Sequence, residues 1–599
     1  MDQSKEISCK CIVEAFYKHV IDETTKSPIM NQFHCRLCEI ENRSKVFHSN
    51  VGKDGYNNLS KHIYRAHKDT WQGEYNKVVE VRRSGGILSY FDSERNNRAQ
   101  AVYSWMRLIV ENNLAFSTVE NQIFRDSVKF APISIKFLMK WMKAVGDDIM
   151  QQIKAELPDY FGLIIDGWSN GATEHFIAIY AVYSSKDGEK QESLLSMSTL
   201  INETNQSGQN HADQISDVLQ MYGKTLSSVQ FLVADNTNLN PAIVKIMNEM
   251  KKELEDYDRD NQAIAFVNCH SHLLNLACNA VADSKESTLK KVEKVMHILR
   301  TNKCAGRLRM YTKLKGKGRN KTRWSSMYAM LKRFFELNEL EVDGRMLLSN
   351  HYFPELFLLD YDFDDGIDKV RAMPTTIEIA QLTILFKQLQ MFNKAQQVLQ
   401  HNSCTFKNAR DVFTKLLKLT DIFDVESMRK MAQYLSFDPR INKNIRSPDF
   451  CNAIYKLQSD LENELTAREA NSVKSFFIIS DESSDESEDS DDHEQDLFES
   501  FQSSLRRQHE KKSRVEAGTK YRSTVYIPPT SNSCERFFSR AKLVFSERRK
   551  SMFPINLEIV LYLHAHNLKW GFNTLFRLMN DDALKEVDEE ENEEENDSD

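Results

Sequence analysis

FGLIIDGWS, at residues 161–169, sets an acidic side chain directly after a run of apolar ones, and this pattern decides the fold. Such a run is typical of a buried strand. A carboxylate at its end, Asp166, is costly unless it is paired, protonated or bound to a metal. FLVAD, at residues 231–235, ends in Asp235 in the same way. Considered singly, either residue could instead cap the turn or helix that follows.

The surrounding sequence predicts an α/β domain that begins near residue 158. The expected elements are strands at 160–169, 175–185 and 193–201, a helix at 211–226, a strand at 231–235, a helix at 241–257, a strand at 263–269 and a helix at 272–284. This order matches the ribonuclease-H-like arrangement, a mixed sheet flanked by helices. In that arrangement the first acid lies within strand one and the second at the end of strand four, beside it. Asp166 and Asp235 occupy those two places.

A third acid is separated from Asp235 by 299 residues. Strand signals stop near residue 284, residues 285–478 read as helical, and a compact pattern returns at 521–580. The α/β domain, first part 158–284, is therefore predicted to be interrupted by a large all-α insertion. Glu535 stands near a helix start in the returning segment. It can be a third ligand for a pair of Mg²⁺ ions, or the second member of a capping box with Asn532.

Two pairs of residues near the N-terminus have the spacing of a zinc site. Cys35-x2-Cys38 and His62-x4-His67 supply two thiolates and two imidazoles, which make a closed, structural Zn²⁺ site. The histidine pair falls in a predicted helix. Alternatively, the histidines are ordinary helix-surface residues and the cysteines are buried apolar groups. The finger is expected within residues 10–75.

A helical module is predicted at residues 90–150, and it could contact DNA or only connect domains. No apolar run approaches the ~20 residues that span a bilayer, and we find no signal peptide. Ten irregularly spaced cysteines favour a reducing compartment over a disulfide framework.

The net charge of −8 hides a basic body. Two acidic segments, 479–515 and 581–599, are predicted to be disordered; without residues 481–496 and 581–599 the net charge is +13. A basic run from Arg300 to Arg323 can neutralise phosphates, or act as a solvated loop or nuclear-import signal. Its glycines suggest a flexible loop. Candidate DNA-binding residues are Arg307, Arg309, Lys313, Lys315, Lys317, Arg319 and Lys321.

Four further residues are candidates for roles beside the acids. Cys269 and His272 have a metal-ligand spacing but no second pair nearby, so a supporting role is favoured. Trp324 follows Arg323 at the end of the basic run. Its ring could stack on an unpaired base, or it could anchor a core.

LIIDGWS, VADNTNLN, NCHSHLLNLACNAV, TRWSSMY and SNSCERFFS, in this order, together resemble the hAT superfamily of DNA transposases, and the N-terminal finger resembles a BED-type zinc finger. The resemblance implies a DDE-type enzyme whose Asp166, Asp235 and Glu535 bind Mg²⁺ or Mn²⁺. It places Cys269, His272, Arg323 and Trp324 beside the active site, with Trp324 stacking on or replacing a flipped base.

The resemblance also implies cut-and-paste transposition in the nucleus. The finger would bind the double-stranded terminal repeats of an element, and the 521–580 region would contribute to a homodimer or higher oligomer. An alternative is a domesticated, non-catalytic descendant that regulates transcription or chromatin through its zinc finger.

Overall fold

The structure is a computed structural model of the whole chain. The chain folds into two compact units. The first comprises residues 1–101 and 579–599, and the second comprises residues 102–578. The residues described are 13, 16–21, 28–40, 46–48, 56–68, 70–71, 87–170, 174–185, 188–254, 263–320, 323–349, 351–357, 373–477, 520–545 and 552–580. The acidic segments at 479–515 and 581–599 lie outside them.

The first unit contains a small antiparallel sheet and two helices. Its strands are β1 (Tyr17–Ile21), β2 (Pro28–Cys35) and β3 (Val46–His48), in the order β1-β2-β3. The helices are α2 (Arg36–Ile40) and α4 (Asn57–Ala66). A small apolar core lies between the sheet and the helix and includes Phe16, Phe33, Leu59 and Ile63. A core of this size usually needs a bound metal or another cross-link to be stable.

The second unit begins within a helix. α6 (Ile87–Asn112) crosses the boundary and ends at Asn113, whose φ of 53° breaks the helix. The short helix α7 (Gln122–Ser127) and the long helix α8 (Ile135–Glu156) follow. These elements confirm that residues 90–150 are mainly helical.

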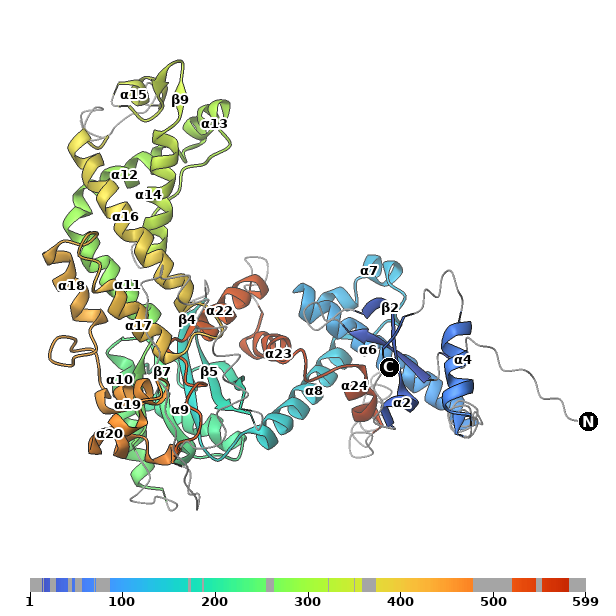
Figure 1. Cartoon of the computed structure of the whole chain (residues 1–599). Coiled ribbons are helices and arrows are strands. Elements are labelled where there is room, and N and C mark those ends of the chain that lie inside the picture. The colour runs from blue at the N-terminus through green and yellow to red at the C-terminus, as the bar shows by residue number, and fades with distance from the viewer. Residues whose placement is uncertain are drawn as a thin grey trace, which may run out of the picture. The chain divides into compact units, whose positions relative to one another are not determined.

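A five-stranded mixed sheet forms the centre of the second unit (Figure 1). Its strands are β4 (Phe161–Ser169), β5 (His175–Ser184), β6 (Lys190–Thr199), β7 (Val229–Ala234) and β8 (Ala265–Asn268). The helices between them are α9 (Gly208–Met221) and α10 (Leu239–Lys252), and α11 (His270–Ala282) follows β8. The predicted order of strands and helices is confirmed.

The strand order β6-β5-β4-β7-β8 puts β4 at the centre of the sheet. β4 pairs antiparallel with β5 and parallel with β7. The C-terminal helix α22 (Asn532–Val544) packs on one face, where Trp168 stacks on Phe538 with ring centroids 6.2 Å apart. Side chains alternate along a strand, so Asp166 shares this face with Trp168.

Helices dominate the chain after the sheet. They are α12 (Glu286–Ile298), α13 (Asn302–Tyr311), α14 (Trp324–Asn338), α15 (Tyr352–Phe357), α16 (Thr376–Leu399), α17 (Phe406–Leu416), α18 (Val425–Leu435), α19 (Pro448–Leu457) and α20 (Ala467–Ser472). A two-stranded hairpin, β9 (Glu341–Val342) and β10 (Arg345–Met346), interrupts them. One apolar cluster joins α11 to α18 into an arm that rises from the sheet (Figure 1). Phe450 of α19 instead packs against Phe231 of β7.

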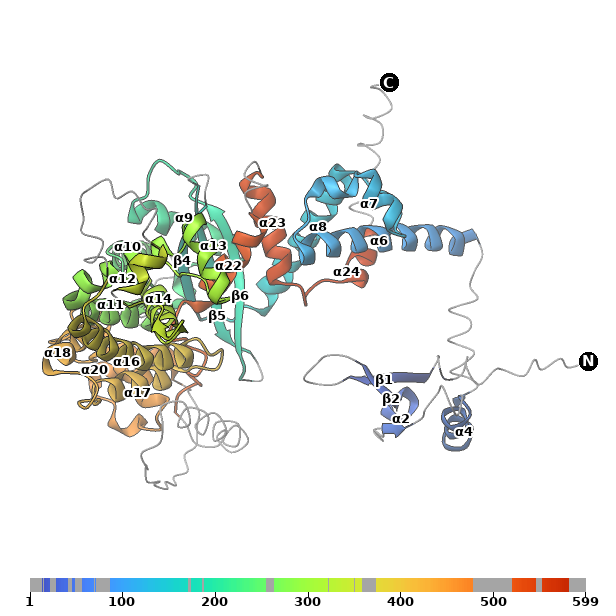
Figure 2. The same ribbon diagram turned by 90° about the horizontal axis from the view of Figure 1, so that it is seen from above.

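The chain returns to the sheet with α22, then α23 (Pro554–Ala565) and α24 (Phe572–Met579). α23 lies beside the edge strand β6 (Figure 2). Its apolar residues Leu557, Val560, Leu561 and Leu563 are buried, so most of the region predicted to form an oligomer packs within the chain. Among the described helices, none is long and apolar enough to cross a membrane.

The pairing of β4 with β7 depends on a glycine. Gly162 lies opposite Phe231, and a β-carbon at Gly162 would come 2.0 Å from Cζ of the Phe231 ring. We expect Gly162→Ala to lower the free energy of unfolding by roughly 1–3 kcal/mol, because the ring must move within a packed core. Urea denaturation would measure the loss. Gly571→Ala is the control, since nothing lies within 4 Å of its added carbon; equal stability of the two variants would contradict the prediction.

Candidate functional site

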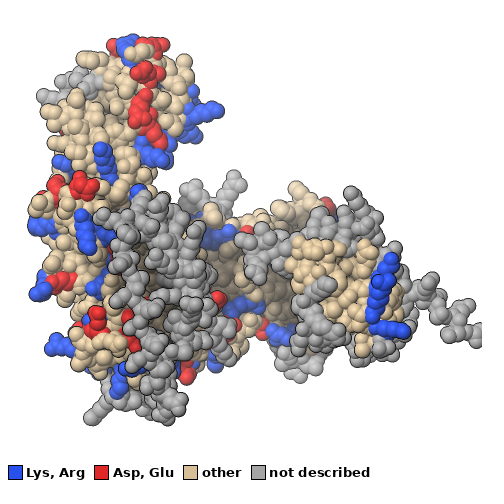
Figure 3. Space-filling view, in the orientation of Figure 1, with Lys and Arg blue, Asp and Glu red and all other residues tan. Residues whose placement is uncertain are grey.

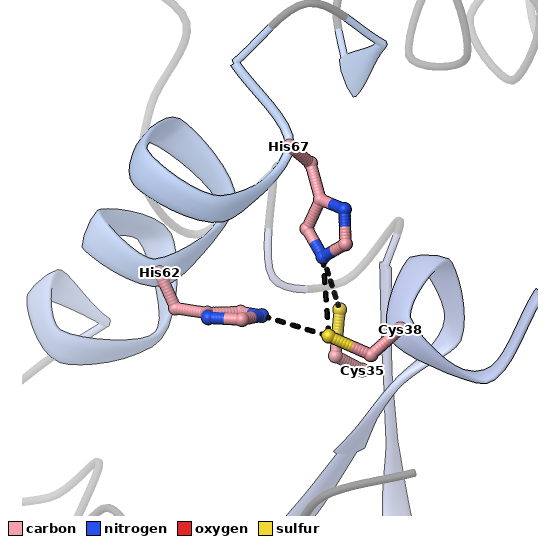
Figure 4. Close-up of side chains that lie close together, drawn as sticks. All are labelled: Cys35, Cys38, His62 and His67. Atoms are coloured by element: carbon pink, nitrogen blue, oxygen red, sulfur yellow. Dashed lines mark hydrogen bonds between the residues drawn. The ribbon is translucent and has the colours of Figure 1, made fainter. Parts of the chain in front are cut away.

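Four side chains of the first unit converge on one point (Figure 4). The sulfur of Cys38 lies 3.2 Å from Nε2 of both His62 and His67, and the sulfur of Cys35 lies 3.7 Å from Nε2 of His67. A tetrahedral site with ordinary Zn–S and Zn–N bonds has sulfur–nitrogen separations of about 3.6 Å. This Cys2His2 cluster can therefore hold one zinc ion.

Local structure explains how the four ligands meet. Cys35 ends β2, and Cys38 lies in the short helix α2 that follows it. His62 lies on α4, and His67 is the residue that ends it. Three of the four side chains are buried, so neither member of the thiol pair nor His67 is an ordinary surface residue.

A second candidate site lies at the centre of the sheet. The parallel pairing of β4 and β7 sets Ile164 opposite Val233. Two residues further along each strand, Asp166 and Asp235 are level and on the same face. Asp235 immediately follows the last residue of β7, whereas the sequence predicted that it would be the last residue of the strand.

Glu535 reaches the same face through a junction between distant segments. The backbone N–H of His270 donates to the carbonyl oxygen of Pro529 at 2.9 Å. The N–H of Ser531 donates to the sulfur of Cys269 at 3.4 Å, and the Ser271 hydroxyl donates to Oδ1 of Asn532 at 3.1 Å. These bonds join the start of α11 to the start of α22.

The three carboxylates act on one another electrostatically. The pKa of Asp166 is raised to about 7, first by burial and then by the charge of Asp235, with a further contribution from Glu535. A hydrogen bond from the N–H of Gly167, 2.9 Å from Oδ1, and the charge of Arg323 partly offset the increase. The fold thus brings together acids that are up to 369 positions apart in the chain.

The two other acids differ in their hydrogen bonds. Oδ1 of Asp235 accepts from Thr237 and from the Asn240 amide, at 2.5 Å from the latter nitrogen. Within the described chain, neither Oδ2 of Asp235 nor the carboxylate of Glu535 accepts a hydrogen bond. The capping-box alternative for Glu535 is wrong, because Ser531 precedes the helix and no side chain caps it.

The acids are more widely spaced than the zinc ligands. Among the described residues, the Cys2His2 cluster is the one group of three or more whose ligand atoms all lie within 4.8 Å of one another. A pair of metal ions ~3.5–4 Å apart does not need all three carboxylates at that spacing, because each ion takes its own subset.

Cys269 and His272 have different surroundings. Cys269 is buried, which raises the pKa of its thiol to about 11, and the hydrogen bond from the Ser531 N–H lowers it in part. As a neutral thiol it supports the start of α22. His272 is half-buried in the first turn of α11. Supporting roles for both remain the favoured prediction.

Arg323 and Trp324 lie at the start of α14 and face different surroundings. Arg323 is exposed, and its charge reaches Asp166. Trp324 is only 4% exposed and belongs to the helical core, with its ring 6.3 Å from those of Tyr328 and Phe392. The prediction that Trp324 stacks on a base is therefore wrong for this conformation, and its alternative, a core anchor, is confirmed.

The basic run divides into structural and exposed residues. Arg319 is paired with Glu286 at 2.7 Å, and Arg307 donates to the carbonyl oxygen of Leu356 at 3.1 Å. Both side chains thus contribute to the fold, and a phosphate-binding role for either stays a prediction. The residues that stay exposed are Arg309, Lys313, Lys315 and Lys317. Lys321 lies outside the described residues.

Sequence reasoning missed Glu192, which holds the first turn of α22. Glu192 accepts a hydrogen bond from the Ser533 hydroxyl and pairs with Lys190 at 2.5 Å. Burial tends to raise its pKa, but Lys190, Ser533 and Arg536 outweigh burial and bring the pKa below its usual range. The charged Glu192 thereby fixes the helix that carries Glu535. An acid in a strand next to a lysine gave no signal of this role.

Comparison of the sequence with protein-family models gives no match, and comparison with curated proteins gives no match either.

The zinc site is testable by metal content. We expect Cys38→Ser to lose zinc and to unfold the first unit, because the Cys38 sulfur is next to both histidines. Zinc content per chain, measured by atomic absorption, should fall from one to near zero. His48→Ala is the control, since His48 is exposed and outside the cluster. An unchanged zinc content in Cys38→Ser would disprove the site.

The acid cluster is testable by the pH dependence of stability. The folded-state pKa of Asp166, about 7, exceeds its ordinary value near ~3.9. Between these two pH values the folded protein keeps a proton on Asp166 that the unfolded chain has lost, so the free energy of unfolding falls as the pH rises toward 7. Asp166→Asn removes this loss. Without Mg²⁺ or Mn²⁺, its stability advantage over the natural protein should grow from pH 5 to pH 8 by on the order of 1 kcal/mol.

Thermal unfolding at the two pH values would measure this difference. Asp217→Asn is the control, because Asp217 is an exposed acid on α9. A constant difference between Asp166→Asn and the natural protein would contradict the electrostatic coupling.

Proposed function

We propose that this protein is a hAT-type DNA transposase, which binds the ends of an element and cuts and joins DNA strands at Asp166, Asp235 and Glu535. The observation that carries the proposal is that Asp166 and Asp235 stand level on the paired strands β4 and β7, on the face where α22, the helix of Glu535, packs. The pKa of Asp166, raised first by burial and then by Asp235 and Glu535, supports it. Two acids level on adjacent strands and a third on a helix from the far end of the chain suit a ribonuclease-H-like nuclease. Acidic side chains that are held together although this lowers the stability of the fold are typical of active or binding sites.

The three side chains fit Mg²⁺ or Mn²⁺. Such hard cations take carboxylate oxygens. Asp166, Asp235 and Glu535 would hold the ions, and Asp235 is oriented for this because Thr237 and Asn240 occupy its other oxygen. Bound in a pair, the ions would stabilise the attacking and leaving oxygens of a phosphodiester.

The protein's own groups would prepare the site in two ways. Asp166 must be ionised to bind a cation, and the charge of Arg323 favours its ionised form. The exposed guanidinium of Arg323 can also contact a phosphate near the acids. Both effects favour activity at neutral pH and above.

The first unit supports a DNA partner independently. Asn58, Lys61, Arg65 and Lys68 are exposed and recur at helical spacing along α4 and its end, so they share one face. α4 contains no acidic residue. A basic helix face on a zinc-bound fold suits contact with phosphates and base edges, as a BED-type finger requires.

The rival function is a regulator that binds DNA but no longer cuts it. Both functions need the finger, whereas only the enzyme needs three ionisable acids in one place. The available oxygens of Asp235 and Glu535 favour the enzyme, and strand cleavage is the measurement that separates the two.

We expect Asp166→Asn, Asp235→Asn and Glu535→Gln each to lower Mg²⁺-dependent cleavage by at least a hundredfold while DNA affinity changes little. The substrate is duplex DNA carrying the inverted repeats that flank the coding sequence, and gel electrophoresis would resolve the nicked products. Asp217→Asn should cut like the natural protein. Binding without cleavage by the natural protein, with either Mg²⁺ or Mn²⁺, would establish the regulator instead.

A further inference from the structure

The chain leaves α13 at Thr312, bends at Lys313, and then runs to residue 320 without helix or strand, and its side chains alternate in exposure from Lys313 to Lys317. Thr312 has φ −156° and ψ 154°. Lys313, Lys315 and Lys317 are exposed, whereas Leu314 and the residue after Lys315 are partly covered. Such alternation is typical of an extended segment, in which alternate side chains point the same way, ~6.8 Å apart. The three lysines therefore form a row, which we call the lysine strip.

The backbone of the lysine strip is held against the arm. Leu314 packs on the apolar cluster of the helices, and Nη1 of Arg333 donates to the carbonyl oxygen of Lys315 at 2.6 Å. Gly316 lies so close to α12 that a β-carbon there would come 2.8 Å from the carbonyl oxygen of Met296. The glycines that suggested flexibility thus permit close packing instead.

The charges of the lysine strip are available to a ligand. Lys313, Lys315 and Lys317 form no ion pair with any residue that the structure describes. Figure 3 shows Lys and Arg side chains gathered on the flank of the arm that carries α13. Because the backbone that carries these lysines is already held in place, binding an anion loses little conformational entropy.

The strip is connected to the candidate active site. Beyond it, Arg319 is fixed to Glu286 at the start of α12, and the backbone N–H of Trp324 donates to Oδ1 of Asn275 on α11 at 3.1 Å. Between these fixed points lies Arg323, whose charge acts on Asp166. The path along the strip thus leads toward the acids.

We propose that the lysine strip binds consecutive phosphates along one strand of duplex DNA and guides that strand toward Asp166. The ~6.8 Å spacing of these lysines along the chain is close to the separation of neighbouring phosphates on one DNA strand. This inference rests on the proposed function, and it names the surface of the arm that receives the substrate. Neutralising phosphates with lysines releases counterions, so the strip has a measurable signature in salt.

The test measures binding of a fluorescent DNA duplex to the full-length protein by anisotropy, across a salt series and without Mg²⁺. Replacing Lys313, Lys315 and Lys317 together by Gln should reduce the slope of log affinity against log salt by about 2.7, and affinity at 0.15 M salt by roughly a hundredfold. Arginine at the same three positions should restore both. The control replaces Lys245, Lys252 and Lys418, which are exposed elsewhere.

The outcomes separate the strip from the proposed chemistry. A slope equal to that of the control overturns the strip, whether or not the protein cuts DNA. A reduced slope in a protein that never cuts supports the strip and refutes the transposase. A natural protein that binds no duplex at any salt concentration overturns both.

A second pair of variants tests the fixed backbone without changing charge. Gly316→Ala should displace the strip from α12 and weaken DNA binding several-fold. Gly318→Ala is the matched control, because its added carbon would meet only the mobile end of the Arg300 side chain. Equal affinities of the two variants would overturn the claim that the strip is rigid.

Discussion

One buried histidine joins the three parts of the chain that must meet to form the candidate active site. His270 begins the helix after β8, its Nδ1 lies 2.8 Å from the carbonyl oxygen of Pro529, and its ring packs against Phe406, Phe413 and Phe437 of the helical insertion. Burial lowers its pKa to about 4, so the ring is neutral at physiological pH. A neutral imidazole can donate one hydrogen bond and remain among aromatic side chains at little cost in desolvation free energy.

The three acids need these surrounding contacts to stay together, because their negative charges repel one another. Burial and like charges disfavour ionised Asp166, so an isolated hairpin carrying this sequence would relax the cluster. Here β4 is paired on both sides, and Glu192, Cys269 and Asn532 fix the start of α22. The rest of the unit thus holds a local arrangement that is unfavourable until a proton or a cation enters, a common relation between stability and function.

The sequence was informative where local chemistry decides structure. Equal apolar runs before Asp166 and Asp235 predicted strands, and the spacing of the cysteine and histidine pairs predicted their cluster. It failed where a residue's role depends on a distant partner. Nothing near Arg319 indicates its pairing with Glu286, 33 positions away, and nothing near Gly316 indicates how closely it passes Met296. Trp324 likewise looked available for a base, because its aromatic neighbours lie on other turns and helices.

The Arg-Trp pair shows how the arm and the sheet act on each other. The indole of Trp324 is packed in the apolar cluster of the arm. The backbone N–H of Trp324 donates a hydrogen bond to Oδ1 of Asn275 on α11. The backbone of Arg323, the preceding residue, is consequently held near the acids, and its exposed side chain acts on Asp166 through its charge. A displacement of α14 within the arm would move this charge away from Asp166 and further raise the pKa of that carboxyl. The packing of the insertion therefore contributes to how readily Asp166 ionises, although burial and the charge of Asp235 have the larger effects. The buried tryptophan thus acts on the site through its neighbour Arg323.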